Sequence, residues 1–191
     1  KQTSNNTTVD TDTVRNIEDI TGTAGKDIIR GNASSNILKG ELGTDSIYGK
    51  EGADIIYGGD NTDNATTSTV YELLDGGEGA DTIYGGAGND SILGGSDDGK
   101  DTLYGDAGND IIYAGAGTDT VDGGADNDSI YGEAGADLLY GGLGNDIVDG
   151  GSEADVIYGD DEARTDTLGG NDVLYGGDGA DTIYAGHGND T

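Results

Sequence analysis

The sequence contains no cysteine, proline, methionine, phenylalanine or tryptophan, and only eight of its 191 residues are Lys or Arg. Without cysteine the chain can form neither a disulfide framework nor a zinc–thiolate site. Without Phe, Trp or Met, a core must be built from Ile, Leu, Val and Tyr. The scarcity of basic residues argues against nucleic-acid binding, because contacts to phosphates need basic clusters.

Membrane and targeting segments are also missing from the sequence. No apolar run approaches the roughly 20 residues that are needed to span a bilayer. The chain begins at Lys1 without a methionine or a signal-type segment, and it stops at Thr191 in the middle of a repeat. We therefore expect a piece of a longer protein.

What the sequence has in excess is negative charge and glycine. Asp and Glu together number 39, the formal net charge is −31, and glycine supplies another 39 residues. Self-repulsion opposes compaction of so acidic a chain, and glycine is costly to order. The chain is therefore either unfolded or held together by something other than a large core. The composition points to bound counter-ions.

A nine-residue repeat covers almost the whole sequence. From Gly22 the chain reads GTAGKDIIR, GNASSNILK, GELGTDSIY and GKEGADIIY, and the phase resumes at Gly76. The consensus is G-G-x-G-x-D-x-U-x, where U is a large aliphatic residue. Four copies match its first six positions strictly, starting at Gly76, Gly85, Gly141 and Gly176. Such short repeats can pair only by stacking on their neighbours, which predicts a quasi-one-dimensional solenoid.

The two parts of each repeat have different roles. The first six residues must reverse the chain, and glycine supplies the positive φ angles that such turns require. The last three predict a short strand whose middle residue points inward. The predicted inward column is Ile29, Leu38, Ile47, Ile56, Ile83, Ile92, Leu103, Ile112, Val121, Ile130, Leu139, Val148, Ile157, Leu174 and Ile183.

This thin column does not stabilise the fold by itself. Burial of one aliphatic side chain contributes about 1.5–3 kcal/mol, whereas ordering nine residues costs roughly 1–2 kcal/mol each. Nearly every repeat also carries Asp at its sixth position, so stacking sets carboxylates in files that repel one another without a cation. Carboxylate and loop carbonyl oxygens suit Ca²⁺, which takes 6–8 ligands flexibly, better than Mg²⁺, which demands a tight octahedron.

These repeats resemble those of the RTX (repeats-in-toxin, haemolysin-type) calcium-binding family, and the resemblance covers nearly the whole chain from about Val14. The segment from Val14 to Gly25 also resembles the usual lead-in to such arrays. The resemblance implies an all-β fold, a right-handed parallel β-roll (RTX β-solenoid) with two nonapeptide repeats per turn. We expect an N-terminal lead-in segment over 1–21, with a first strand near 14–20, and a calcium-binding roll over 22–191.

The family's ligands can be carried onto this sequence position by position. Calcium is expected between successive loops on the same side, so that Asp128 works beside Asp110 and Asp146. We expect about ten ions. The implied carboxylate ligands are Asp27, Asp45, Asp54, Asp81, Asp90, Asp101, Asp110, Asp119, Asp128, Asp137, Asp146, Asp155, Asp172, Asp181 and Asp190. Backbone carbonyls are expected from Gly76, Gly79, Gly85, Gly88, Gly105, Gly108, Gly132, Gly135, Gly141, Gly144, Gly176 and Gly179.

The repeat pattern fails in three places. Asn36 replaces the sixth-position Asp, so we expect a weak or absent site there, with the strand over 37–39 retained. Residues 58–75 form either two degenerate repeats, with Asp63 and Glu72 at the sixth positions, or one repeat with an excursion that rejoins as a strand over 72–75. A second excursion occupies 159–171 and rejoins the pattern at Asp172. Such excursions are expected to be surface loops.

Ten of the eleven tyrosines occupy the ninth position of a repeat, where alternation directs them outward. They predict aromatic files on the sheet faces. Stacking across strands would shield the sheet, whereas a sticky surface would serve self-association or contact with a glycan or another surface. His187, in the loop AGHGND, is interpreted as a solvated loop residue.

The resemblance implies export in an unfolded state, followed by folding on calcium outside the cell. We therefore expect an extracellular, secreted or cell-surface protein in which this module has a structural or adhesive role. The alternatives are a C-terminal secretion and folding module of a secreted enzyme or toxin, whose active domain lies outside this chain, and an ice- or glycan-binding face. No carboxylate pair is distinguished by a neighbouring His, Lys or nucleophile, so we expect no enzymatic activity.

Overall fold

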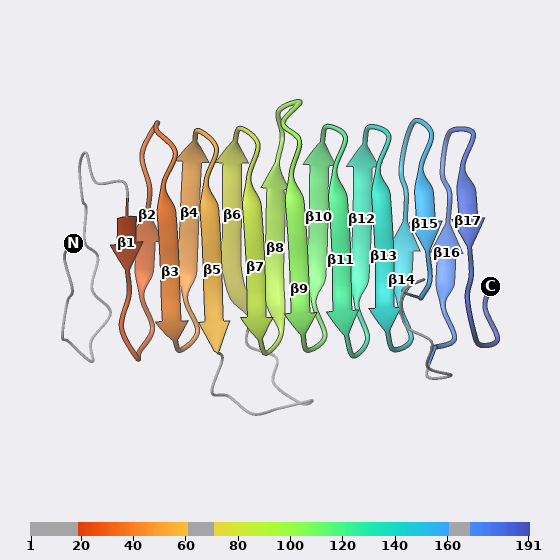
Figure 1. Ribbon diagram of the computed structural model, residues 1–191, viewed down its shortest axis with the longest axis horizontal. Coiled ribbons are helices and arrows are strands. Elements are labelled where there is room, and N and C mark those ends of the chain that lie inside the picture. The colour runs from red at the N-terminus through yellow and green to blue at the C-terminus, as the bar shows by residue number, and fades with distance from the viewer. Residues whose placement is uncertain (1–18, 61–70, 161–168) are drawn as a thin grey trace.

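The computed structural model describes residues 19–60, 71–160 and 169–191. Within these residues the chain forms seventeen strands and no helix. Accordingly, the described part contains no helix that is long and apolar enough to cross a membrane. Figure 1 shows the strands side by side along the long axis of the molecule, connected by tight loops at both edges.

The strands alternate between two parallel sheets, so that one turn of the roll contains two repeats. In the described residues, the odd-numbered strands form a nine-stranded sheet: β1 (Asp19–Thr21), β3 (Ile37–Leu42), β5 (Ile55–Asp60), β7 (Thr82–Ala87), β9 (Thr102–Ala107), β11 (Thr120–Ala125), β13 (Leu138–Leu143), β15 (Val156–Tyr158) and β17 (Thr182–Tyr184). The even-numbered strands form an eight-stranded sheet: β2 (Ile28–Arg30), β4 (Ser46–Glu51), β6 (Glu72–Glu78), β8 (Asp90–Gly95), β10 (Ile111–Ala116), β12 (Ser129–Ala134), β14 (Ile147–Asp149) and β16 (Val173–Tyr175).

Equivalent positions of successive turns lie directly beside one another. Ile112 of β10 pairs with Ile130 of β12, and Val121 of β11 pairs with Leu139 of β13, both in parallel register. An unbroken pair of nine-residue repeats returns the chain to the same sheet after 18 residues. The predicted fold class, an all-β parallel β-roll with two repeats per turn, is confirmed.

The core is the predicted aliphatic column, enclosed between the two sheets. Its members from Leu38 to Ile157 are fully buried, and Ile29 is 4% exposed. Two expectations at the last turn need correction. Leu174 is only partly buried, and Ile183 is 42% exposed, because β16 and β17 are the last strands of their sheets and no further turn packs on them.

The structure decides between the two interpretations of residues 58–75. Strand β6 is the next strand after β5 among the described residues, lies in the opposite sheet, and places Leu74 beside Ile47 and Ile92. The segment is therefore one repeat with an excursion, and the interpretation as two degenerate repeats is wrong. Leu74 joins the core and was missed in the predicted column. Asp63 lies outside the described residues.

The described residues include strands at the end of the predicted lead-in segment and after the second excursion. Strand β1 covers the end of the predicted first strand, and residues 14–18 lie outside the described part. After the second excursion, Asp172 is fully buried and β16 pairs with β14 in phase. Strand β3 is retained after Asn36, as expected.

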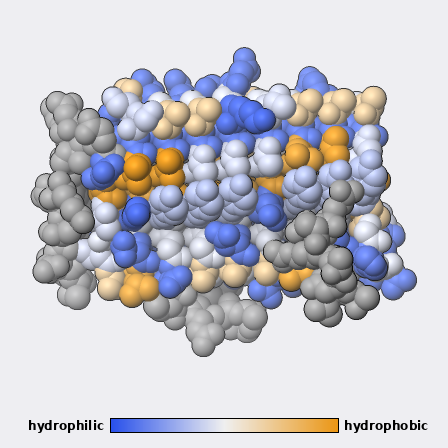
Figure 2. Space-filling model, viewed as in Figure 1, coloured by the Kyte–Doolittle hydropathy of each residue, from blue (hydrophilic) through white to orange (hydrophobic). Residues whose placement is uncertain are grey.

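Eight of the ten ninth-position tyrosines form ring stacks on the outer faces of the two sheets. On the nine-stranded sheet, Tyr84 stacks between Tyr57 and Tyr104, with ring centroids 5.1 and 4.9 Å away and nearly parallel planes. Further stacks join Tyr140, Tyr158 and Tyr184 on that sheet, and Tyr113 and Tyr131 on the other. Figure 2 shows rows of similar side chains running along the long axis of the molecule. The predicted outward tyrosine files are confirmed, and their rings stack across strands.

Candidate calcium-binding loops

The sixth-position residues line up in two files, one along each long edge of the roll. The first file contains the loops before the even-numbered strands and the last loop: Asp27, Asp45, Glu72, Asp90, Asp110, Asp128, Asp146, Asp172 and Asp190. The second file contains the loops before the odd-numbered strands: Asn36, Asp54, Asp81, Asp101, Asp119, Asp137, Asp155 and Asp181. The structure therefore brings every predicted carboxylate into one of two regular files.

Within a file, the two oxygens of each carboxylate have different surroundings. In fourteen of these carboxylates, one oxygen accepts a hydrogen bond from the backbone N–H of the sixth-position residue one turn earlier, at 2.7–3.3 Å. Asp128 thus accepts from Asp110 N and donates its own N–H to Asp146, both at 2.8 Å. This pairing confirms that neighbours in a file lie one turn apart.

The second carboxylate oxygen is buried and has no hydrogen-bond partner among the described residues. This holds for Oε2 of Glu72 and for Oδ2 of Asp45, Asp54, Asp81, Asp110, Asp119, Asp128, Asp137, Asp146, Asp155 and Asp172. A buried acceptor without a partner costs free energy, and native structures leave few of them. A repeated row of such oxygens is what a series of bound cations would satisfy.

In every one of these repeats that begins with glycine, a backbone carbonyl oxygen borders the same space as the free carboxylate oxygen. A β-carbon added at Gly105 would collide with Asp110 Oδ2 and with the carbonyl oxygen of Gly123 in the next turn. The same pairing recurs at Gly49, with Asp54 Oδ2 and the carbonyl of Gly76. The first glycine of a repeat therefore keeps open a space that a carboxylate oxygen and a carbonyl oxygen both border.

The predicted glycines fall into two groups by this criterion. The Cα atoms of the first-position glycines lie next to the spaces around the Oδ2 atoms, and carbonyl oxygens of first-position residues one turn on border the same spaces. The predicted glycines of this group are Gly76, Gly85, Gly105, Gly132, Gly141 and Gly176. The fourth-position glycines lie instead against the backbone of the neighbouring turn: Gly79, Gly88, Gly108, Gly135, Gly144 and Gly179. Their participation as ligands stays a prediction, as does that of the aspartates.

The donor set is composed of single carboxylates and carbonyls. No group of three or more His, Cys, Asp or Glu side chains that could hold a metal gathers anywhere in residues 19–60, 71–160 and 169–191. A site built from side chains alone, such as a tetrahedral zinc site, is therefore not supported there. The oxygens that are present, from backbone and carboxylate together, are those that Ca²⁺ accepts at flexible geometry. The residues fit calcium.

Burial in the files shifts the acidity of the carboxylates. Loss of hydration is the main cause that raises the pKa of Asp110 to about 9 and that of Asp128 to about 8, and neighbouring carboxylates in the file add to the shift. In the second file, burial raises the pKa of Asp54 and Asp81 to about 6. In the absence of a metal ion, Asp110 and Asp128 of the first file therefore hold protons at neutral pH, and a cation must displace them.

Three further carboxylates are absent from the predicted ligand set: Glu72, which belongs to the first file, and Asp97 and Asp160, which lie in loops beside the files. Glu72 takes the place of Asp, is fully buried, and has a pKa raised to about 8, mainly by burial. Asp97 and Asp160 lie in the lengthened loops, where Asp97 Oδ2 accepts a hydrogen bond from Gly79 N at 3.1 Å. Both carry a second oxygen that is buried without a hydrogen-bond partner in the described residues. In the sequence, the signal for Asp97 and Asp160 was an acidic residue in the loop before β9 and another at the start of the second excursion.

Asp160 also holds the last loop through His187. The backbone N–H of His187 donates to Asp160 Oδ2, and the imidazole Nδ1 lies 3.9 Å from the same oxygen. The side chain of His187 is 66% exposed. The prediction of a solvated loop residue therefore holds for the ring, although its backbone is tied to the file.

The two edges differ in the residue that precedes the aspartate. Along the first file, fifth-position asparagines form a ladder in which Oδ1 of one accepts from the backbone N–H of the next. The ladder runs through Asn89, Asn109, Asn127, Asn145, Asn171 and Asn189. The second file has no such series, since Ala, Lys or Thr precedes its aspartates from Asp81 on. The recurring Asn-Asp pair in alternate repeats was a readable signal for this difference.

Comparison with known proteins agrees with the geometry. The sequence profile of the RTX calcium-binding nonapeptide repeat (4 copies) matches the chain over residues 16–47, 39–64, 72–99, 96–130, 113–148, 123–157 and 166–191. No curated protein matches the chain. Because the matched residues make up most of the sequence and coincide with the turns of the roll, the chain belongs to the RTX calcium-binding repeat family.

Proposed function

We propose that this roll folds on calcium outside the cell and then serves as a structural or adhesive part of an extracellular or cell-surface protein. The observation that carries the calcium switch is the row of buried carboxylate oxygens without hydrogen-bond partners in the described residues. Without a cation, these charges lose hydration and repel one another along each file. RTX repeats are also typical of secreted proteins, which supports the extracellular setting.

The energetics support a switch between calcium levels. Extracellular calcium modules bind with Kd values of about 10⁻⁴–10⁻³ M. At a tenfold excess over Kd, each site adds roughly 1.4 kcal/mol, so about ten sites contribute on the order of 14 kcal/mol. This contribution is comparable to the entire free energy of unfolding of a typical domain, about 5–15 kcal/mol. In a compartment with far less free calcium, the contribution disappears and the chain stays unfolded during export.

The regular surface supports a structural rather than a catalytic role. Buried carboxylates repeat along each file, and within residues 19–60, 71–160 and 169–191 no single place combines an acid, a base and a nucleophile of its own. The outer faces carry stacked tyrosines at a spacing set by the strands. Within a stack each ring covers the face of the next, so Tyr84 and Tyr158 present ring edges and hydroxyls to the outside. This geometry favours contact between flat surfaces over the stacking of sugars on open ring faces.

A calcium titration tests the switch. Folding followed by far-UV circular dichroism should have a midpoint near 10⁻⁴–10⁻³ M calcium. A midpoint at the submicromolar concentrations of a cytosol would contradict folding outside the cell. Mg²⁺ at the same concentrations is the matched control and should fold the chain poorly, because the donor set does not impose a tight octahedron.

The structural role needs a separate test. Sedimentation velocity and electron microscopy in millimolar calcium should show assembly of the folded roll. The variant Tyr84→Ala removes the middle ring of a stack and should weaken that assembly, whereas Tyr71→Ala, outside the ninth-position rows, should not. A roll that stays monomeric at all concentrations would overturn the adhesive role and leave the calcium switch intact.

A further inference from the structure

The tyrosine row of the eight-stranded sheet is interrupted near its middle. From strand to strand its ninth positions read Arg30, Tyr48, Asp75, Leu93, Tyr113, Tyr131, Asp149 and Tyr175. At Asp75 and Leu93, two adjacent positions lack the large ring, and Gly77 and Gly95, the next outward positions of the same strands, have no side chain. The result is a hollow of about 510 Å³ between the turns that carry Tyr48 and Tyr113.

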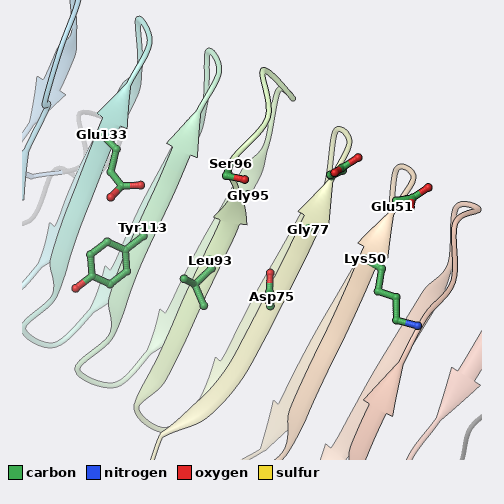
Figure 3. A pocket seen from close by; sticks show the side chains of 10 residues that line it. Lys50, Glu51, Asp75, Gly77, Leu93, Gly95, Ser96, Tyr113 and Glu133 are labelled. Carbon is green, nitrogen blue, oxygen red and sulfur yellow. The ribbon is translucent and has the colours of Figure 1, made fainter.

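The walls of the hollow combine apolar and acidic groups (Figure 3). Leu93 and Tyr113 line it together with the carboxylates Glu51, Asp75, Glu78 and Glu133. Lys50 is the one basic residue among the described residues of the lining, and in Figure 3 its side chain extends away from Asp75. The carboxylates do not form a group that could hold a metal ion among the described residues. The charge of the hollow therefore suits an organic cation with an apolar stem.

The same rows already seat cations on ring faces. The guanidinium carbon of Arg30 lies 5.0 Å from the ring centroid of Tyr48, in the same row as the hollow. On the other sheet, Lys39 Nζ lies 5.0 Å from the ring centroid of Tyr57. These contacts lie within the range of cation–π attraction, about 6 Å. The face of a ninth-position ring that is not covered by another ring is thus a place where this chain accepts a positive charge.

Tyr113 offers such a ring at the edge of the hollow. One face of Tyr113 stacks on Tyr131 at 4.9 Å, and on the opposite side its strand neighbour in the row is Leu93. A leucine side chain does not extend the aromatic stack. The other side of the Tyr113 ring therefore borders the hollow, within one strand spacing of Leu93 and two of Asp75.

We propose that this hollow binds an arginine side chain presented by a basic segment of a partner protein. The guanidinium lies against Tyr113 and is neutralised by Asp75 and Glu133, and its aliphatic stem packs on Leu93. Guanidinium is favoured over ammonium because it is planar, stacks on rings and is weakly hydrated. The chain has a net charge of −31, which draws basic partners to it from a distance. This inference requires the folded roll but neither its assembly nor an adhesive role.

The experiment uses small probes on the whole chain in millimolar calcium at low salt. N-acetyl-arginine methylamide and its citrulline analogue, which has the same shape without the charge, are titrated while backbone amide shifts are followed by NMR. The arginine probe should bind with shifts centred on Leu93 and Tyr113, and citrulline should bind at least about tenfold more weakly. Equal binding of the two probes, or shifts elsewhere on the roll, would overturn the proposal.

Two variants and one control locate the site. Leu93→Tyr extends the stack into the hollow and should abolish binding, and Asp75→Asn should weaken it by about tenfold. Asp149→Asn makes the same change in the same row outside the hollow and should leave the affinity unchanged. Circular dichroism in calcium confirms that each variant is folded, so a folding failure is separated from a binding failure. Unchanged arginine binding by folded Leu93→Tyr would refute the assigned site.

Discussion

Replacing Asp128 by asparagine should remove calcium-dependent stability while leaving the local hydrogen bonding in place. Asp128 Oδ1 accepts a hydrogen bond from Asp110 N at 2.8 Å, and the amide oxygen of asparagine can do the same. Asp128 Oδ2 is buried without a hydrogen-bond partner in the described residues. In the variant an NH₂ group takes its place, which turns an anionic ligand into a donor that faces the cation.

The size of the effect follows from the position of Asp128 within its file. It lies between Asp110 and Asp146, so the substitution affects the spaces on both sides of its loop. At tenfold excess over Kd each lost site removes roughly 1.4 kcal/mol, so the expected loss is about 1.4–3 kcal/mol. At the lowest calcium concentrations that still fold the chain, the variant should lose little stability, because burial raises the pKa of Asp128 to about 8 and the neutral amide escapes this desolvation.

The assay is urea unfolding at a series of calcium concentrations. The free energy of unfolding plotted against the logarithm of calcium concentration has a slope that counts the ions bound on folding. Asp128→Asn should reduce that count by one or two. Asp122→Asn, an outward residue of the neighbouring strand β11, is the matched control and should leave the slope unchanged. If Asp128→Asn lowers stability equally at all calcium concentrations, the residue is structural and the reasoning is refuted.

Two further predictions concern pH and glycine. Burial raises the pKa of Asp110 to about 9, so its protonation contributes stability to the calcium-free fold below its unfolded value near 4, and that contribution is lost as the pH rises through 9. Lowering the pH from 8 to 6 should therefore reduce the stability that calcium adds, measured by urea melts as the rise in the free energy of unfolding between two calcium concentrations that both fold the chain; a larger rise at pH 6 would contradict this sign. Gly135→Ala should destabilise the roll in thermal melts by about 2–4 kcal/mol, because Gly135 has a φ of 130° and its added β-carbon would collide with Gly117, whereas Gly25→Ala meets nothing within 4 Å and should be nearly neutral. Equal melting temperatures for the two alanine variants would show that the close backbone approach is not real.

The regular part of the fold could be predicted because every repeat has the same residue types at the same positions. The aliphatic residue at the eighth position identifies the core, and the period of nine fixes which residues stack. Together with the two repeats per turn that the family resemblance implies, this phase predicted Asp110 beside Asp128, as the structure has them. Nothing in this prediction required knowledge of long-range contacts, since every contact in a solenoid is between neighbouring turns.

The irregular part was harder because the phase is lost where residues are inserted. Between Asp60 and Glu72 the sequence allowed either one repeat or two, and only the pairing of Leu74 with Ile47 decides. Glu72 was left out of the predicted ligands for the same reason. The exposure of Ile183 was missed because the repeat pattern places this residue inward, whereas β17 is the last strand of its sheet and no further turn covers it.

Details that depend on side-chain geometry also lay beyond the sequence. The division of labour between Oδ1 and Oδ2, and the convergence of Oδ2 with the carbonyl of the first glycine one turn on, are properties of stacked turns in three dimensions. The hollow at Asp75 and Leu93 likewise appears only when the two ninth positions are known to be adjacent strands.

The central claim is that calcium, and not the apolar column, holds this roll together. Far-UV circular dichroism of the chain at neutral pH, first in millimolar calcium and then after addition of excess chelator, tests it most directly. The account predicts a β-sheet spectrum that changes to that of a random coil on chelation and returns when calcium is restored. A β-sheet spectrum that persists in excess chelator would contradict it.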